Sequence, residues 1–184
     1  RAGTAAHPVL PRRAAGSGVA AFALSPAARV DSCGDDPVVA ALRDTCRWSE
    51  AFISHPGIPG AHGFYVASAY AVQGEDNEAF FDDVLQAMAR VGTQVPYFLF
   101  GDFQQDINTS HTISGAVASG LVFCHDSWLS ENDRDAPTFC RRAAWNRHDW
   151  EEGASRIDFA LLNRVAANLV VDAKLLRNLS VPGH

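Results

Sequence analysis

The feature that most constrains the fold is an apolar run that stops abruptly at polar residues. Residues 97–100 (YFLF) follow Pro96 and are followed by Gly101 and Asp102. An apolar run with these boundaries is typical of a central strand that is covered on both faces. Such a strand would deliver Asp102 to the edge of the sheet, where its charge can meet solvent or a ligand. A Gly-Asp turn after a strand is also common without any function, so the residues alone leave both interpretations open.

A second apolar segment, residues 155–162 (SRIDFALL), carries a single carboxylate, Asp158, near its start. Burying an ionised carboxylate costs free energy, so we expect Asp158 to accept a hydrogen bond or to pair with a cation. Histidine is a natural partner, and His184 closes the chain in a turn-like setting. An aspartate that orients a histidine, beside a second aspartate such as Asp102, is typical of general-base catalysis. Sequence spacing does not show that the three residues meet.

The pattern along the chain predicts an α/β fold. Strands are expected at residues 19–24, 49–53, 64–71, 97–100, 121–124, 138–141, 156–162 and 170–176. The clearest helix begins at an Asp76 or Asn77 cap and ends at Gly92, with an apolar stripe at helical spacing that belongs to the core. Further helices are expected at 110–119 and, behind an Asp36 cap, at 37–45, and a turn is expected after Asn163.

Composition limits the number of domains. The chain has 184 residues, of which 47% are hydrophobic and 20% charged, which suits one core and one domain over residues 1–184. No apolar stretch approaches the roughly 20 residues that span a bilayer, so we expect no membrane insertion. Because the chain begins with Arg1 and its one methionine is Met88, we expect its natural start to lie elsewhere. The compartment is not fixed by the sequence, and an intracellular location is the working expectation.

Charge bears on the partners. The net charge of −6 argues against tight, generic DNA binding, for which a basic contact face is usual. A local cluster departs from this balance, because Arg141, Arg142 and Arg147 surround Trp145. The cations could contact phosphates and the indole could stack on a base, which makes these four residues candidates for substrate binding. The alternative is a solvated loop whose tryptophan docks on the domain.

The four cysteines, Cys33, Cys46, Cys124 and Cys140, include no C-x-x-C pair. A zinc site built from Cys124, His125, Cys140 and His148 is disfavoured, because structural zinc prefers closely spaced ligand pairs. Buried free thiols are the favoured interpretation.

Short motifs in a fixed order suggest a family. Residues 101–104 (GDFQ), 137–139 (PTF), 155–159 (SRIDF) and 182–184 (PGH) resemble the endonuclease/exonuclease/phosphatase superfamily, the DNase I-like hydrolases of phosphodiesters and phosphomonoesters. Upstream, residues 63–70 are similar to the family's strand that ends in a tyrosine, and residues 16–22 to its glycine-led inner strand. The resemblance implies a DNase I-like α/β sandwich, in which two packed mixed sheets are flanked by helices.

The chain also departs from the family pattern. Gln104 replaces the usual asparagine, and Gly183 stands where relatives carry an aspartate that binds metal. The asparagine-bearing strand and the strand with the magnesium-binding glutamate do not precede the segment at Gly16. We therefore expect a domain fragment that lacks the N-terminal strands, and we expect the segment alone to be inactive.

The resemblance assigns roles to five residues. It places His184, paired with Asp158, beside the scissile phosphate, and lets Asp102 orient or activate the attacking water. Tyr70 and Gln104 would contact phosphate oxygens. Without the resemblance, Tyr70 would be an ordinary strand aromatic at the rim of a sheet. The implied cofactor is Mg²⁺, or Mn²⁺, held chiefly by the missing glutamate, with Asp102 as a weak candidate ligand.

Together these features favour metal-dependent phosphodiester hydrolysis, most consistent with an endonuclease that cleaves nucleic acid. One alternative is a phosphatase that acts on a small phosphorylated substrate, for which the acidic balance is mild support. The other is a catalytically degenerate binding or scaffold module, which Gln104, Gly183 and the absent glutamate would explain.

Overall fold

The computed structural model describes residues 29–32, 36–54, 63–134, 138–140, 154–155 and 157–174. The strand expected at 19–24 lies outside these ranges. Among the described residues, no helix is long and apolar enough to cross a membrane.

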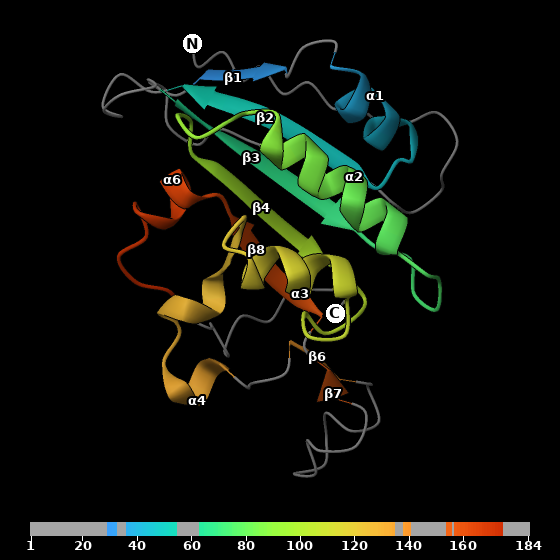
Figure 1. Cartoon of the computed structure of the whole chain (residues 1–184), viewed down its shortest axis with the longest axis vertical. Helices are drawn as coiled ribbons and strands as arrows, with labels where there is room; N and C mark the ends of the chain where they lie inside the picture. The colour runs from blue at the N-terminus through green and yellow to red at the C-terminus, as the bar shows by residue number, and fades with distance from the viewer. Residues whose placement is uncertain are drawn as a thin grey trace, which may run out of the picture.

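A mixed six-stranded sheet forms the centre of the described fold (Figure 1). Its strands are, in spatial order, β1 (Arg29–Ser32), β2 (Trp48–Ser54), β3 (Gly63–Tyr70), β4 (Tyr97–Asp102), β8 (Asp158–Leu162) and β5 (Phe123–Cys124). Strands β3 and β4 are parallel, and all other neighbours are antiparallel. Strands β6 (Phe139–Cys140) and β7 (Ala154–Ser155) form a separate two-stranded ribbon. The predicted α/β class is confirmed.

Three longer helices lie over one face of the sheet (Figure 1). They are α1 (Pro37–Asp44), α2 (Glu78–Ala89) and α3 (His111–Ala118). Three shorter helical segments complete the described elements: the 3-10 helix η1 (His125–Trp128), α4 (Glu131–Arg134) and α6 (Arg164–Ala167). The three long helices were predicted within three residues at each end.

Local capping explains why these helices begin where they do. The Asp36 carboxylate accepts hydrogen bonds from the backbone N–H groups of Val38 and Val39 at the start of α1. At α2, the carboxylate of Asp76 accepts from the Glu78 N–H, whereas the Asn77 side chain bonds instead to the preceding turn. Each cap satisfies N–H groups that have no partner inside the helix.

The main core lies between the sheet and the three long helices. Its largest fully buried side chains are Tyr97, Phe81, Phe103, Leu42, Leu99 and Ile113. A buried carboxylate, Glu50 of β2, sits in this layer and is bonded by the Arg90 guanidinium and by the Tyr97 hydroxyl, the latter at 2.5 Å. The network satisfies a charge that would otherwise be costly to bury and joins β2, β4 and the end of α2.

The expectation that strand 97–100 is covered on both faces is wrong. Tyr97 and Leu99 are fully buried, but Phe98 is half-buried and Phe100 is 50% exposed. The strand is central in the sheet, yet in the described part of the chain the long helices cover one face. On the other face, η1 and α6 contribute to a smaller cluster around Leu162 and Phe98.

Two predicted strands also need correction. A strand is expected at 170–176, but its described residues, 170–174, form no strand. The Val171 side chain is 93% exposed. The strand expected at 121–124 begins at Phe123, because the Leu121 N–H is held by the Ala116 carbonyl in the turn that ends α3. Gly120, with φ +70°, forms this turn.

Candidate active site

Three of the predicted site residues stand side by side at one end of the sheet. Tyr70 is the last residue of β3, Asp102 the last of β4 and Asp158 the first of β8. Tyr70 is registered opposite Asp102, and Asp102 opposite Asp158. Residues in direct register point to the same face, with Cβ atoms about 4.5–5.5 Å apart across an antiparallel pair. We call these three residues the strand-end row.

The strand-end row points away from the long helices. Its chain neighbours Ala69 and Phe159 are buried in the core under the helices, so the alternation along a strand turns Tyr70 and Asp158 to the opposite face. Tyr70 is 41% exposed and Asp158 is exposed. The expectation that Asp158 is buried is therefore wrong. As the first residue of its strand, Asp158 lies at the end of the sheet.

Asp102 is held by the residue two positions along the chain. Its Oδ1 accepts the Gln104 backbone N–H at 3.1 Å, and its Oδ2 accepts a hydrogen from the Gln104 amide Nε2 at 2.6 Å. Gln104 adopts a left-handed conformation, with φ +55°, that a non-glycine residue enters at a cost. The amide nitrogen carries two hydrogens, so its bond to Asp102 leaves one for a further acceptor.

The glycine of the GDFQ motif is required by space. A Cβ added at Gly101 would lie 2.7 Å from the Ala69 carbonyl oxygen and 2.9 Å from the Phe103 ring. The ring in turn stacks on Phe159 at 4.0 Å between centroids. Gly101 thus permits close packing immediately before Asp102.

Thr138, from the PTF motif, fixes the start of β8. Its hydroxyl oxygen accepts the backbone N–H of Ile157 at 3.1 Å and that of Asp158 at 2.9 Å. The Ile157 carbonyl accepts the Phe103 N–H at 2.7 Å, which joins the GDF and PTF segments through one residue. The sequence resemblance marks the PTF motif without giving Thr138 a role, although a hydroxyl inside an otherwise apolar motif is a signal for one.

The strand-end row suits a divalent cation chemically. Asp102 and Asp158 present carboxylates on neighbouring strands, where like charges directly opposite each other are destabilising. Carboxylate oxygens are the ligands that Mg²⁺ prefers in proteins. The donor set therefore fits the implied metal.

Several predicted site residues lie outside the described ranges. They are His184 and the four substrate-binding candidates Arg141, Arg142, Trp145 and Arg147. The pairing of His184 with Asp158 and the contact of the arginines with substrate stay predictions.

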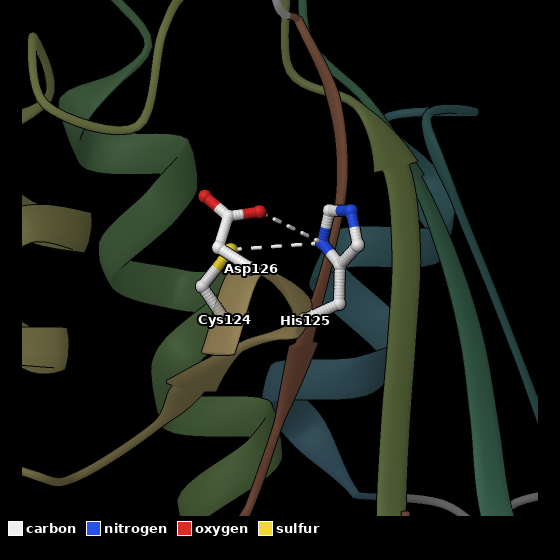
Figure 2. Close-up of side chains that lie close together, drawn as sticks. All are labelled: Cys124, His125 and Asp126. Atoms are coloured by element: carbon white, nitrogen blue, oxygen red, sulfur yellow. Dashed lines mark hydrogen bonds and ion pairs between the residues drawn. The ribbon is translucent and has the colours of Figure 1, made fainter. Parts of the chain in front are cut away.

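A second group of side chains gathers where β5 passes into η1 (Figure 2). The His125 Nδ1 lies 3.6 Å from the Cys124 sulfur and 3.6 Å from the Asp126 Oδ1. Cys124 and His125 belong to the zinc set that sequence spacing disfavours, whereas Asp126 is not part of that set. His148 and the side chain of Cys140, the remainder of that set, lie outside the described part of the chain.

Comparison with known proteins gives similar solved structures and no sequence match. No family model and no curated protein matches the chain. A mannosyl-6-phosphatase of Bacteroides thetaiotaomicron is similar with a TM-score of 0.47 and 17% identity, over 64% of this chain and 42% of that one. The endonuclease domain of TRAS1, a telomere-specific non-LTR retrotransposon, is similar with a TM-score of 0.47 and 13% identity, over 67% and 53%.

A third similar structure is the human Nocturnin catalytic domain, with a TM-score of 0.44 and 16% identity over 64% of this chain and 41% of that one. Members of the endonuclease/exonuclease/phosphatase family are thus among the structures this chain resembles. The chain spans about half or less of the length of each.

Proposed function

We propose that this chain is part of a metal-dependent phosphoester hydrolase of the DNase I-like kind, which cleaves phosphodiester bonds in nucleic acid. The observation that carries the proposal is the register of the strand-end row. Two carboxylates and a phenol that lie far apart in the sequence share one face at one end of three adjacent strands. Each ends or begins a strand in a motif that the family resemblance singles out.

In this proposal, each residue has a different role in hydrolysis. The Asp102 carboxylate, fixed at both oxygens by Gln104, orients the attacking water and accepts its proton. The exposed Tyr70 hydroxyl, opposite Asp102 in the register, donates a hydrogen bond to a phosphoryl oxygen. Asp158, whose backbone is fixed by Thr138, orients the imidazole of His184.

A divalent metal complements these residues. Asp102 and Asp158 would contribute carboxylate oxygens to it, and Mg²⁺ bound there would offset the negative charge that develops on the phosphoryl group. Positioning by the protein groups then supplies much of the remaining rate enhancement.

The test is a magnesium-dependent cleavage assay on the full-length polypeptide that the resemblance predicts, with duplex DNA, RNA and a small phosphomonoester as substrates. Asp102→Ala and His184→Ala should each lower cleavage by about 10²-fold or more. The matched control is Asp83→Ala, which removes an exposed carboxylate from α2, on the far face of the sheet, and should leave the rate unchanged.

Each outcome bears on the proposal. Cleavage that survives both Asp102→Ala and His184→Ala would reject the proposed site. If only the phosphomonoester is hydrolysed, the proposed substrate would be a small phosphorylated molecule and not nucleic acid. Failure to cleave any phosphoester with Mg²⁺ or Mn²⁺ would contradict hydrolysis and favour the binding or scaffold module.

A further inference from the structure

We infer that Cys124, His125 and Asp126 form a binding site for a single zinc ion, or for a divalent transition metal of similar ligand preference. The site would lie at the junction of β5 and η1 (Figure 2). On β8, Cys124 pairs with Leu161, three residues along the strand from Asp158. The inference goes beyond the proposed hydrolysis and does not depend on it.

The distances between the three ligand atoms suit tetrahedral zinc. Zn–S bonds of about 2.3 Å and Zn–N bonds of about 2.0 Å at a tetrahedral angle separate sulfur from nitrogen by about 3.6 Å. The Cys124 sulfur lies 3.6 Å from His125 Nδ1. The Asp126 Oδ1 lies 3.6 Å from the same nitrogen, and all three ligand atoms lie within 4.8 Å of one another. Small side-chain rotations would therefore bring them around one ion.

The chemistry of the donors selects the metal. A thiolate beside an imidazole and a carboxylate suits zinc and similar first-row ions, whereas Mg²⁺ takes oxygen ligands and avoids sulfur. Cys124 is 5% exposed, while the side chains of His125 and Asp126 are 22% and 20% exposed. The sulfur is thus at the inner side of the group, and the Asp126 Oδ1 atom is also buried although its side chain is partly exposed. With three protein ligands, a water molecule would complete the tetrahedron.

His125 Nδ1, the ring nitrogen near the other two donors, already accepts a backbone hydrogen bond that a metal ion would displace. The Ala160 backbone N–H donates to Nδ1 at 3.0 Å, so Nδ1 carries its lone pair and the ring proton lies on Nε2. This bond continues the β5–β8 ladder, whose last backbone pair is Cys124 with Leu161. An ion at Nδ1 would take over the lone pair and release the Ala160 N–H. Metal binding therefore has a second, local readout on β8.

The test is a titration of the metal-free chain with Co²⁺, which reports a bound thiolate through a charge-transfer absorption band, followed by displacement with Zn²⁺. We expect one equivalent of Co²⁺ to produce the band, Zn²⁺ to remove it, and excess Mg²⁺ to leave it unchanged. The matched control is a chain in which Cys33, Cys46 and Cys140 are all changed to serine, which should keep the band because Cys124 remains.

Two variants remove ligands while keeping similar volume. Cys124→Ser should abolish the band, and Asp126→Asn should weaken binding by about tenfold or more, since even changes outside the ligand shell have effects of that size. Circular dichroism of each metal-free variant verifies the fold, and Asp126→Asn keeps the test decisive if Cys124→Ser does not fold. Zinc should also accelerate hydrogen exchange of the Ala160 amide.

Several results would overturn the inference: no thiolate band with the unaltered chain, a band that persists in Cys124→Ser, or full affinity in Asp126→Asn. Zinc binding with an unchanged Ala160 exchange rate would contradict ligation through His125 Nδ1. None of these measurements uses a phosphoester. Their results therefore do not bear on the proposed hydrolysis, which is tested by its own cleavage assay.

Discussion

At the scale of single residues, the contact between Gln104 and Asp102 is the most informative departure from the family pattern. The longer amide folds back onto the carboxylate and holds Oδ2 at 2.6 Å, while the backbone N–H holds Oδ1. A group that fixes both oxygens of a proposed catalytic carboxylate acts on the orientation of that carboxylate. We therefore propose that Gln104 positions Asp102.

Replacement of the Gln104 amide tests this role. In the full-length polypeptide, Gln104→Ala should lower kcat by up to about a hundredfold, because small displacements of a catalytic group have effects of that order. KM should change little. Gln104→Asn, which keeps an amide and tolerates the left-handed backbone, should recover part of the rate. Steady-state kinetics separates the two parameters, and a rise in KM alone would mean that the amide binds substrate instead.

A second residue, Glu78, predicts a pH dependence of stability. Burial raises its pKa, but hydrogen bonds from the Thr112 side chain and backbone, from Ser110 and from Gln105 together lower the pKa below the ordinary glutamate value of 4.5. The Thr112 N–H bond, at 2.8 Å, ties the start of α2 to the start of α3. A carboxyl with a lowered folded pKa stabilises the fold above its unfolded pKa and loses this effect as the pH falls through the folded pKa.

Urea unfolding of Glu78→Gln checks the sign. At neutral pH, the variant should be less stable than the unaltered chain, and the difference should shrink as the pH falls below 4.5. Glu75→Gln, which changes an exposed side chain in the preceding turn, is the matched control and should show no such loss. A stability difference that grows in acid would contradict the lowered pKa.

At the scale of elements, one buried side chain joins three of them. Asn163 ends β8 and caps α6, where its Oδ1 accepts the Ala166 N–H at 2.9 Å. The same oxygen accepts the Tyr97 N–H at 3.0 Å, and Nδ2 donates to the Val95 carbonyl at 2.8 Å. Asn163 therefore fixes the beginning of β4 relative to the end of β8, the two strands whose opposite ends carry Asp102 and Asp158.

Truncation of this side chain should be costly. Asn163→Ala removes all three bonds and leaves buried backbone groups unpaired, so the free energy of unfolding should fall by about 2–4 kcal/mol. Ser110→Ala, which removes the cap bond of α3 to Ile113 and the bond to Glu78, should lower it by about 1–2 kcal/mol. Urea denaturation of the two variants gives the comparison. Equal losses would mean that Asn163 acts as a simple helix cap.

Elements set by local chemistry could be predicted from the sequence. The helices α1 and α3 follow their caps, Asp36 and Ser110, and an apolar stripe locates α2. Features set by distant partners could not. The short strand β1 carries little local signal and exists through its pairing with β2. Residues 170–174 lack a strand partner in the described fold.

The candidate site divides in the same way. Motifs identified Tyr70, Asp102 and Asp158, but their alignment depends on the register of β3, β4 and β8, which tertiary pairing decides. The sequence does not indicate that Asp158 is exposed, because an apolar segment suggests burial along its whole length. The two hydrogen bonds from Gln104 to Asp102 could not be predicted, because they depend on the left-handed backbone conformation of Gln104.

At the scale of the whole molecule, the sheet separates stability from chemistry. One face packs on α1, α2 and α3 and holds the main core, and the other carries the strand-end row. The opposed carboxylates of Asp102 and Asp158 lie on the side that contributes less burial. The fold tolerates the repulsion between these two carboxylates because the apolar layer on the helix face supplies most of the hydrophobic stabilisation.

Two adjacent residues of β4 test this separation. Leu99 is fully buried under the helices, whereas Phe100, its neighbour, is 50% exposed on the face of the strand-end row. In this chain, Leu99→Ala should lower the free energy of unfolding by about 2–5 kcal/mol, the usual range for a buried leucine that leaves a cavity. Phe100→Ala removes a larger side chain but should cost well under half as much, because much of its surface already meets solvent. Urea denaturation with the two variants in parallel measures both values. Comparable losses would show that the two faces share the stabilisation, and the structural separation of core and site would then fail.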